Sequence, residues 1–200
     1  MRKFALLASG FVVLLFAGFA EAQQIDFAVG ASGLFSSNYG KSASQAYLPA
    51  TEKGGIYPSL SADFIFKNRF GFNGEVAVRD KQGLYNGYQD FRPVFYDANA
   101  LFAPRFGKKV SADFMAGVGA ESVIFYNQFA TCYGYSAGCP TFVSSNHLMG
   151  HLSAGVRYYL WRNAFVRPEA HLYLIRNNFE FSSNKVGRLG VSIGYSFNRE

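Results

Sequence analysis

The sequence predicts an all-β protein: an eight-stranded antiparallel transmembrane β-barrel with up-and-down topology. Three observations lead to this prediction. First, eight segments alternate apolar and polar residues with a period of two, the period of a strand with two different faces. Second, the connections between these segments alternate between long and short. Third, hydrophobic residues make up 50% of the chain and aromatic residues 18%, yet beyond residue 22 no apolar run is long enough for a membrane-spanning helix.

The N-terminus has the three parts of a secretory signal peptide. Arg2 and Lys3 form a positively charged start, residues 4–19 are apolar, and Ala20-Glu21-Ala22 has the small-x-small form of a cleavage site. A membrane anchor is the alternative, but the apolar core is short for a bilayer of ~30 Å and the cleavage site follows at once. We therefore expect residues 1–22 to be a signal peptide cleaved after Ala22, and residues 23–200 to form one barrel domain.

The alternating segments follow one another along the rest of the chain. The predicted strands are residues 24–34, 56–66, 70–79, 94–102, 110–121, 147–160, 164–175 and 188–197. In the first, Phe27 and Val29 share one face while Asp26 and Gly30 share the other. The other seven repeat this separation. In chain order, their apolar faces carry Leu60 and Phe64, Phe72 and Val76, Tyr96 and Ala98, Phe114 and Val118, Leu152 and Val156, Leu172 and Leu174, and Val191 and Ile193.

The connections define the two rims of the predicted barrel. Long loops at 36–55, 80–91, 122–146 and 176–187 alternate with short turns at 67–69, 105–109 and 161–163. Long loops on one rim and short turns on the other are typical of bacterial outer-membrane barrels. We therefore expect the short turns and both chain ends on the periplasmic side. An unpaired strand edge is costly in hydrocarbon, so the first and eighth strands should pair and close the sheet.

The charged residues indicate which face meets lipid. Alternation alone does not separate a membrane barrel from a soluble, lipocalin-type barrel with an apolar interior. In the eight segments every charge lies on the polar face, and every lysine beyond residue 22 falls in a predicted loop or turn. Aromatic residues of the apolar face collect near the short turns, as in the girdle of a membrane barrel. We therefore expect the apolar face to meet lipid and the polar face to fill a narrow bore.

The inward-facing charges are the main candidate site. Buried charge is costly unless it is paired, so arginine–carboxylate pairs should plug the bore. A proton or ion pathway and a ligand site are the alternatives. The predicted charge network consists of Asp63, Glu75, Arg79, Asp113, Glu121, Arg157, Arg167, Glu169 and Arg188.

The histidines and cysteines are the candidate metal ligands of the sequence. His147, His151 and His171 fall on the inward face of two adjacent strands, where we favour hydrogen-bonded histidines over a convergent zinc site. Cys132 and Cys139 lie close together in a turn-rich stretch, and such cysteines usually pair in an oxidising compartment. We expect a disulfide between them, no metal and no cofactor.

The whole arrangement resembles the small OmpA/OmpX-like outer-membrane barrels of the porin-like superfamily, over residues 24–197. The last strand, Leu189-Gly-Val-Ser-Ile-Gly-Tyr-Ser-Phe197, is similar to the C-terminal signal that the assembly machinery of this family reads. The resemblance implies a non-enzymatic protein of the bacterial outer membrane whose partners are outer-membrane lipid and the assembly machinery. We expect a monomer that either stabilises the envelope or binds an unidentified ligand through its surface loops.

Two other functions stay open. His151 and Ser153, with Glu169 on the next strand, resemble the lipid A deacylase family, which implies a lipid-modifying esterase in which the histidine activates the serine and the glutamate orients the histidine. All three residues lie on the face expected to point inward. A narrow channel is the other alternative. The net charge of +6 comes without a basic run or a known binding motif, so nucleic acid is not an expected partner.

Overall fold

A computed structural model of the chain describes residues 24–36, 52–66, 69–85, 89–126, 142–178, 180–181 and 183–199. The predicted signal peptide lies outside these ranges, and so do Cys132 and Cys139. The cleavage after Ala22 and the disulfide therefore remain predictions.

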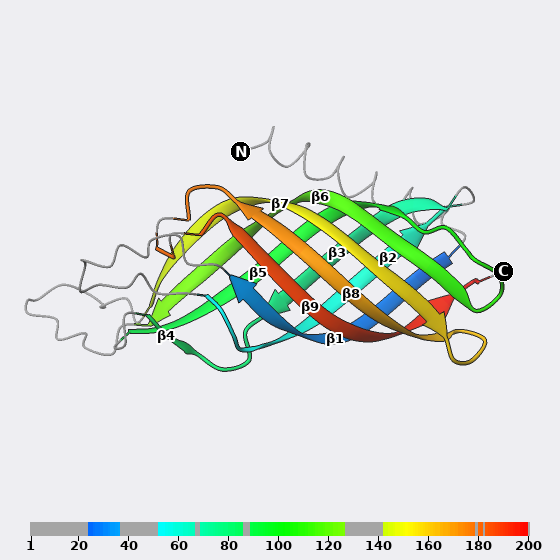
Figure 1. Cartoon of the computed structure of the whole chain (residues 1–200), viewed down its shortest axis with the longest axis horizontal. Coiled ribbons are helices and arrows are strands. Elements are labelled where there is room, and N and C mark those ends of the chain that lie inside the picture. The colour runs from blue at the N-terminus through cyan, green and yellow to red at the C-terminus, as the bar shows by residue number, and fades with distance from the viewer. Residues whose placement is uncertain are drawn as a thin grey trace, which may run out of the picture.

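The strands form one antiparallel sheet rolled into a closed barrel (Figure 1). They are β1 (Gln24–Ser36), β2 (Ile56–Ile65), β3 (Phe70–Val78), β4 (Gly83–Tyr85), β5 (Gln89–Phe102), β6 (Val110–Tyr126), β7 (Phe142–Tyr159), β8 (Ala164–Ile175) and β9 (Lys185–Phe197). Eight long strands make the ring, while β4 is a three-residue strand that pairs with β5 at one rim. The predicted eight-stranded, up-and-down barrel is confirmed.

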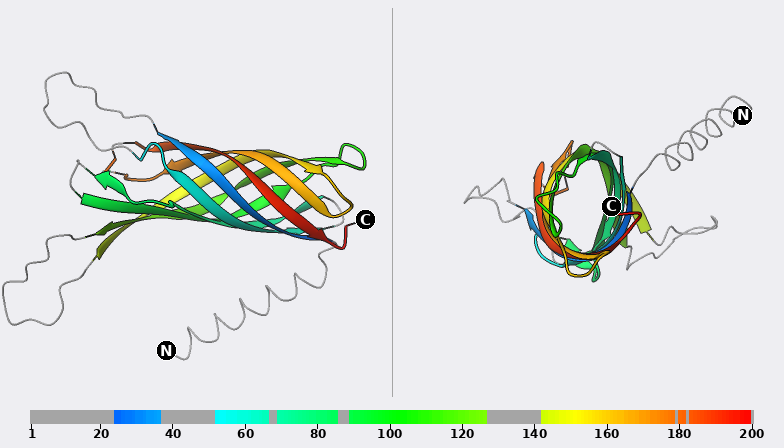
Figure 2. Two further views of the ribbon diagram at one scale, coloured as in Figure 1. Left: turned by 90° about the horizontal axis from the view of Figure 1, so that it is seen from below. Right: turned by 90° about the vertical axis from the view of Figure 1, so that its right-hand side faces the viewer.

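Two pairings close the ring. The first and last strands, β1 and β9, pair from Ile25 opposite Phe197 to Ser36 opposite Val186. Strand β3 pairs directly with β5, from Phe70 opposite Phe102 to Val78 opposite Val94. The end-on view in Figure 2 shows the resulting ring of strands. Closure gives each long strand two neighbours, so the sheet leaves no open side along the barrel wall.

The outer face of the barrel is apolar and the inner face holds the buried charges. Along β3 the exposed side chains of Phe72 and Val76 alternate with the buried side chains of Asn73 and Glu75. A ring of exposed apolar side chains is stable in lipid and not in water. The predicted orientation of the two faces is therefore confirmed. Among the described residues, no helix is long and apolar enough to cross a bilayer.

Several strands reach further toward the long loops than the sequence predicts. Residues 122–126 and 142–146 of the predicted loop 122–146 belong to β6 and β7, and Lys185 opens β9 instead of lying in a loop. The extension of β6 has a physical cause, because its inward residues Val123 and Phe125 pack against Phe91 of β5. Strand β4 likewise lies within the predicted loop 80–91.

The interior is arranged in levels along the barrel axis, and β7 passes through them. From the long-loop rim to the short-turn rim its inward side chains include His147, Met149, His151, Arg157 and Tyr159. The inward face also carries apolar side chains that the alternation did not predict. An apolar layer lies between two polar levels and consists of Leu34, Tyr57, Ala77, Phe95, Met149, Tyr173, Ile175 and Val186. In a bore this narrow, large aromatic side chains fill the space between the charged levels.

Candidate functional site: the interior of the barrel

Arg157 of β7 is the centre of a charge cluster in the half of the bore near the short turns. Its Nε and Nη2 atoms donate to Asp113 Oδ2 at 3.0 and 2.7 Å. Nη2 also donates to Asp63 Oδ2 at 3.1 Å, and Nη1 pairs with Asp26. The Arg157 side chain has no access to solvent. One guanidinium therefore bridges carboxylates from β1, β2 and β6 across the bore.

A second arginine completes this cluster. Arg167 of β8 places Nη1 at 2.8 Å from Asp63 Oδ2 and Nε at 2.8 Å from Glu169 Oε2. Its Nη2 donates to Ser61 at 2.9 Å. Charged groups removed from water need such partners. The lower charge cluster, as we call it below, consists of Asp26, Asp63, Asp113, Arg157, Arg167 and Glu169.

The next level contains two stacked histidines. The ring centroids of His151 and His171 lie 5.2 Å apart. Arg188 Nη2 is 3.0 Å from His171 Nε2, His171 Nδ1 is 3.0 Å from His151 Nε2, and His151 Nδ1 is 2.8 Å from Asn99 Oδ1. Arginine can only donate and an amide oxygen can only accept. His151 Nδ1 therefore donates to Asn99, while Arg188 Nη2 faces both nitrogens of the His171 ring, at 3.0 Å from Nε2 and 3.1 Å from Nδ1. Arg188 also pairs with Glu75.

The geometry around Ser153 does not form a catalytic triad. Ser153 lies opposite His171 in the β7–β8 pairing, and Glu169 lies opposite Gly155. Both ring nitrogens of His151 are engaged, by Asn99 and His171, while Glu169 pairs with Arg167. In this arrangement the His151 nitrogens are committed to partners other than the Ser153 hydroxyl. The three residues share the inward face without the hydrogen bonds that serine chemistry requires.

Above the histidines, the apolar layer crosses the bore. The rings of Phe95 and Tyr173 are stacked with centroids 5.0 Å apart, and Tyr57 lies 5.9 Å from Phe95. All three side chains are fully buried. The sequence does not predict this layer. The three rings occupy positions that the alternation assigns to the polar face of their strands, and an aromatic residue at such a position is the signal that could have revealed them.

Four titratable side chains gather above the apolar layer, near the long loops. Glu52 precedes β2, Glu121 belongs to β6, His147 belongs to β7, and Glu180 follows β8. The carboxyl groups of Glu52 and Glu121 face each other without access to solvent. His147 Nε2 is 3.1 Å from Glu180 Oε2. We call this group the rim cluster.

Two members of the rim cluster, Glu52 and Glu180, are not predicted from the sequence, because they lie in the predicted loops 36–55 and 176–187. Burial raises the pKa of Glu52 above its ordinary value of 4.5, against the opposing effect of hydrogen bonds. One of these comes from Asn178, whose Nδ2 donates to Glu52 Oε1 at 3.1 Å. A buried carboxyl group beside a second carboxyl group favours the protonated form. Nothing in the local sequence distinguishes Glu52 from an exposed loop residue.

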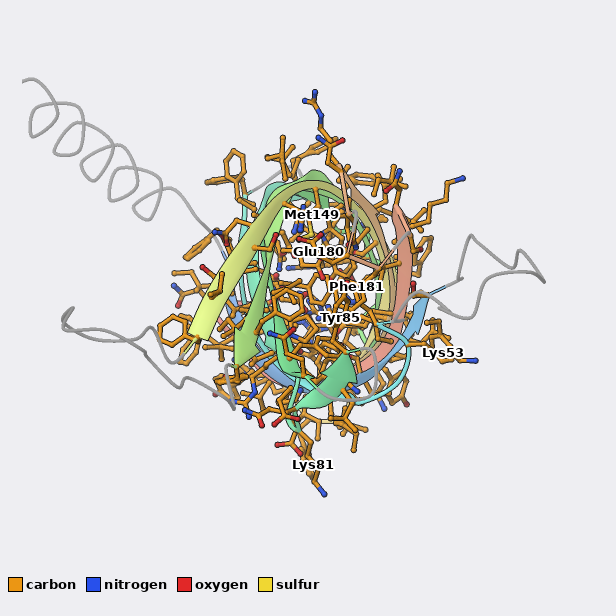
Figure 3. All side chains as sticks on the ribbon, turned by 90° about the vertical axis from the view of Figure 1, so that its left-hand side faces the viewer. Lys53, Lys81, Tyr85, Met149, Glu180 and Phe181 are labelled. Carbon is orange, nitrogen blue, oxygen red and sulfur yellow. The ribbon has the colours of Figure 1, made fainter. Side chains whose placement is uncertain are left out.

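Aromatic side chains cover the rim cluster at the mouth of the barrel. Phe181 lies 5.0 Å from Phe91 and 5.6 Å from Tyr85, measured between ring centroids. Figure 3 looks into this mouth and shows Tyr85, Glu180 and Phe181 inside the ring of strands, whereas Lys53 and Lys81 point away from it. The guanidinium carbon of Arg79 lies 5.1 Å from the Phe91 ring centroid. Arg79 therefore belongs to this aromatic cap and lies just beyond β3.

The predicted network residues are thus spread over several levels. Asp63, Asp113, Arg157, Arg167 and Glu169 meet in the lower charge cluster, Glu75 and Arg188 lie beside the histidines, Glu121 lies in the rim cluster and Arg79 in the aromatic cap. Within the described part of the chain, no group of three or more histidine, cysteine, aspartate or glutamate side chains is arranged to hold a metal ion.

Comparison with known proteins identifies the fold. No family model matches the sequence and no curated protein matches it. Among solved structures, the attachment invasion locus protein Ail of Yersinia pestis, in complex with the heparin analogue sucrose octasulfate, is 17% identical with a TM-score of 0.60, over 87% of this chain and 98% of that one. Neisserial surface protein A is 14% identical with a TM-score of 0.56, over 87% and 96%.

A third structure with the same fold is the outer membrane protein OprG of Pseudomonas aeruginosa. It is 16% identical with a TM-score of 0.53, over 88% of this chain and 97% of that one. At these identities the likeness is one of fold, and it extends over nearly the full length of each of the three structures. By its fold, the chain is a small eight-stranded β-barrel of the bacterial outer-membrane type.

Proposed function

We propose that the protein is a non-enzymatic, non-conducting outer-membrane barrel that binds a partner outside the cell through its long-loop rim. The observation that carries this proposal is the filled bore. The lower charge cluster, the stacked histidines, the apolar layer and the aromatic cap follow one another along the axis. An ion entering the bore would have to displace buried side chains at each of these levels, and paired charges at the lower charge cluster.

The rim of long loops supports a binding role more than a purely structural one. The β6–β7 pairing continues to Tyr126 opposite Phe142, whereas β8 pairs with β7 only from Met149 inward. The ends of β6 and β7 therefore extend past β8 at this rim, and β5 follows β6 as far as Phe91 opposite Phe125 (Figure 1). Phe142 and Val143 are exposed on this projection. Exposed apolar side chains on an ordered projection favour contact with another macromolecule.

The closed bore is tested by electrical recording. Purified protein is reconstituted in planar lipid bilayers and single-channel current is measured at neutral pH. We expect no conductance steps above those of the lipid alone. Reproducible steps of one size that require folded protein would support the channel alternative instead.

The binding role is tested by removing the loop that connects the projecting ends of β6 and β7. Tyr126 and Phe142 lie directly opposite each other, so a two-residue Asn-Gly turn can join them in place of residues 127–141. Because the Ail structure holds a heparin analogue, immobilised heparin is the first probe. We expect intact cells that display the full chain to be retained and cells that display the shortened chain to be retained less. Residues 127–141 contain no lysine or arginine, so this loss would report contacts of the loop other than charge pairing. A heat-dependent shift on SDS gels verifies that the shortened barrel folds, and equal retention of both would contradict the proposal.

A further inference from the structure

The described residues outside the strands at the rim of short turns carry positive charge only. The described residues outside the strands at this rim include six cationic residues and no aspartate or glutamate: Arg69, Arg105, Lys108, Lys109, Arg162 and Arg199. The opposite rim is mixed, since Glu52, Asp80 and Glu180 lie there beside lysines and arginines. The asymmetry indicates that the two rims meet different chemical environments.

Two short turns and the C-terminal segment come together on one side of this rim. Arg199 Nη1 donates to the backbone oxygen of Arg162 at 2.7 Å, and Nη2 donates to the backbone oxygen of Lys108. The guanidinium carbon of Arg199 lies 3.3 Å from the ring centroid of Tyr159. Arg199 therefore ties the turn after β5 to the turn after β7.

The joined turns border an open hollow of about 640 Å³, which is lined by Lys108, Lys109, Trp161, Arg162 and Arg199 among other residues. Lys108, Lys109 and Arg162 are exposed to solvent. Trp161 is 75% exposed and lies beside exposed Leu160. Cationic groups and a tryptophan at the edge of an apolar barrel wall are the combination that fits a membrane–water interface.

We propose that this hollow binds the phosphate of an anionic phospholipid in the periplasmic leaflet, with the acyl chains against Leu160 and the neighbouring outer wall. The short turns of such barrels face the periplasm, so the headgroups of that leaflet lie at the level of the hollow. Each lysine or arginine near an anionic surface strengthens binding about fivefold. Three exposed cations around one hollow therefore favour an anionic headgroup over a zwitterionic one.

The single tryptophan of the chain makes the proposal directly measurable, because Trp161 lies in the hollow. Protein is reconstituted in phosphatidylcholine vesicles that contain either phosphatidylglycerol or phosphatidylcholine with brominated acyl chains, and the quenching of Trp161 fluorescence is compared. We expect brominated phosphatidylglycerol to quench at several-fold lower mole fraction at low salt. The preference should vanish near 1 M salt, where the Debye length is about 3 Å.

Matched variants separate this rim from the other. K108Q/K109Q/R162Q should remove the preference for phosphatidylglycerol, whereas K81Q/R176Q/K185Q, which removes the same charges from the long-loop rim, should retain it. A heat-dependent shift on SDS gels verifies folding, and K108Q alone serves if the triple variant does not fold. Equal quenching by the two lipids in the wild type, or equal loss in both triple variants, would overturn the proposal. Reversal by inorganic phosphate would assign the hollow to free phosphate and overturn the lipid assignment.

Discussion

Arg157 on β7 donates two hydrogen bonds, from Nε and Nη2, to one carboxylate oxygen of Asp113 on the neighbouring strand β6. The residue directly opposite Asp113 is Gly155, so the two charged residues are diagonal neighbours on the inner face. Diagonal neighbours lie within reach of a long side chain. The remaining guanidinium donors are then free to reach Asp26 and Asp63 across the bore.

Replacing Arg157 by Met should destabilise the barrel strongly. The change leaves Asp26 and Asp113 without their nearest cation, and breaking a buried ion pair by removing one partner costs about 3–5 kcal/mol. Urea unfolding in lipid vesicles, followed by Trp161 fluorescence, measures the loss. Lys81→Met on the exposed rim is the control and should change the free energy of unfolding by less than about 0.5 kcal/mol. A comparable effect of the two substitutions would show that the cluster contributes no specific stability.

Gly117 of β6 is expected to resist substitution. A Cβ atom at this position would overlap the backbone oxygen of Ala98 and the side chain of Asn99 on β5. Such overpacking typically costs about 1–3 kcal/mol, so Gly117→Ala should lower the urea midpoint. Gly33→Ala is the matched control, because a Cβ there meets no atom within 4 Å. A stable Gly117→Ala barrel would mean that β5 and β6 can separate slightly at this point.

Glu52 should make the stability of the barrel depend on pH. Its pKa in the folded protein is raised above 4.5 by burial, so the folded state holds this proton more tightly than the unfolded chain. The contribution to stability is therefore complete below about pH 4.5 and is lost as the pH rises through the folded-state pKa. Glu52→Gln cannot ionise, and it should exceed the wild type in stability at neutral pH while the two converge in acid.

The measurement is a series of urea unfolding curves between about pH 4 and pH 8. Asp80→Asn, at an exposed position on the same rim, is the control for removing one carboxylate. Because the Glu121 carboxyl group faces that of Glu52, the Glu52→Gln difference reports the titration of the Glu52–Glu121 pair. If the difference in unfolding free energy between Glu52→Gln and the wild type did not vary with pH, the prediction that folding raises the pKa of Glu52 would be wrong.

Ser153→Ala should leave envelope lipid chemistry unchanged. Both nitrogens of His151 are engaged by Asn99 and His171, so the Ser153 hydroxyl lacks an activating base. Fatty acid release from outer-membrane lipid, followed by mass spectrometry, should equal that of membranes without the protein for both the wild type and the variant. Release by the wild type that is lost in Ser153→Ala and kept in Ser111→Ala would establish the esterase alternative.

The strands could be predicted because lipid and bore impose opposite chemistry on alternate residues. In β3 this constraint alone places Phe72 and Glu75 on opposite faces. The signal fades where β7 leaves the membrane, since Ser144, Ser145 and Asn146 are polar on both faces. Water then solvates the outer side, and alternation no longer marks a strand. This is why the sequence places the start of β7 too far along the chain.

The interior partners could not be predicted in the same way. Arg157 and Asp63 are 94 residues apart in sequence, and Arg167 and Asp63 are 104 residues apart. The alternation predicts that such residues point inward. Which of them pair depends on how far each strand is shifted along the barrel axis relative to the strands on the other side of the bore. Glu52 is harder still, because it reaches the interior from outside any strand.

The seam between β1 and β9 sets a condition on how the molecule is made. β1 pairs with the next strand β2 along one edge, but the backbone groups of its other edge pair only with β9, the last strand of the chain. Until the barrel closes, the inserting sheet has two unpaired strand edges in the hydrocarbon. Either edge can pair with a strand of a second molecule. The start of β1 and the end of β9 lie at the same rim, so they can be joined in a circular permutant whose chain begins and ends between β6 and β7. In this permutant the β6–β7 pairing would form last, and the closed barrel would be the same.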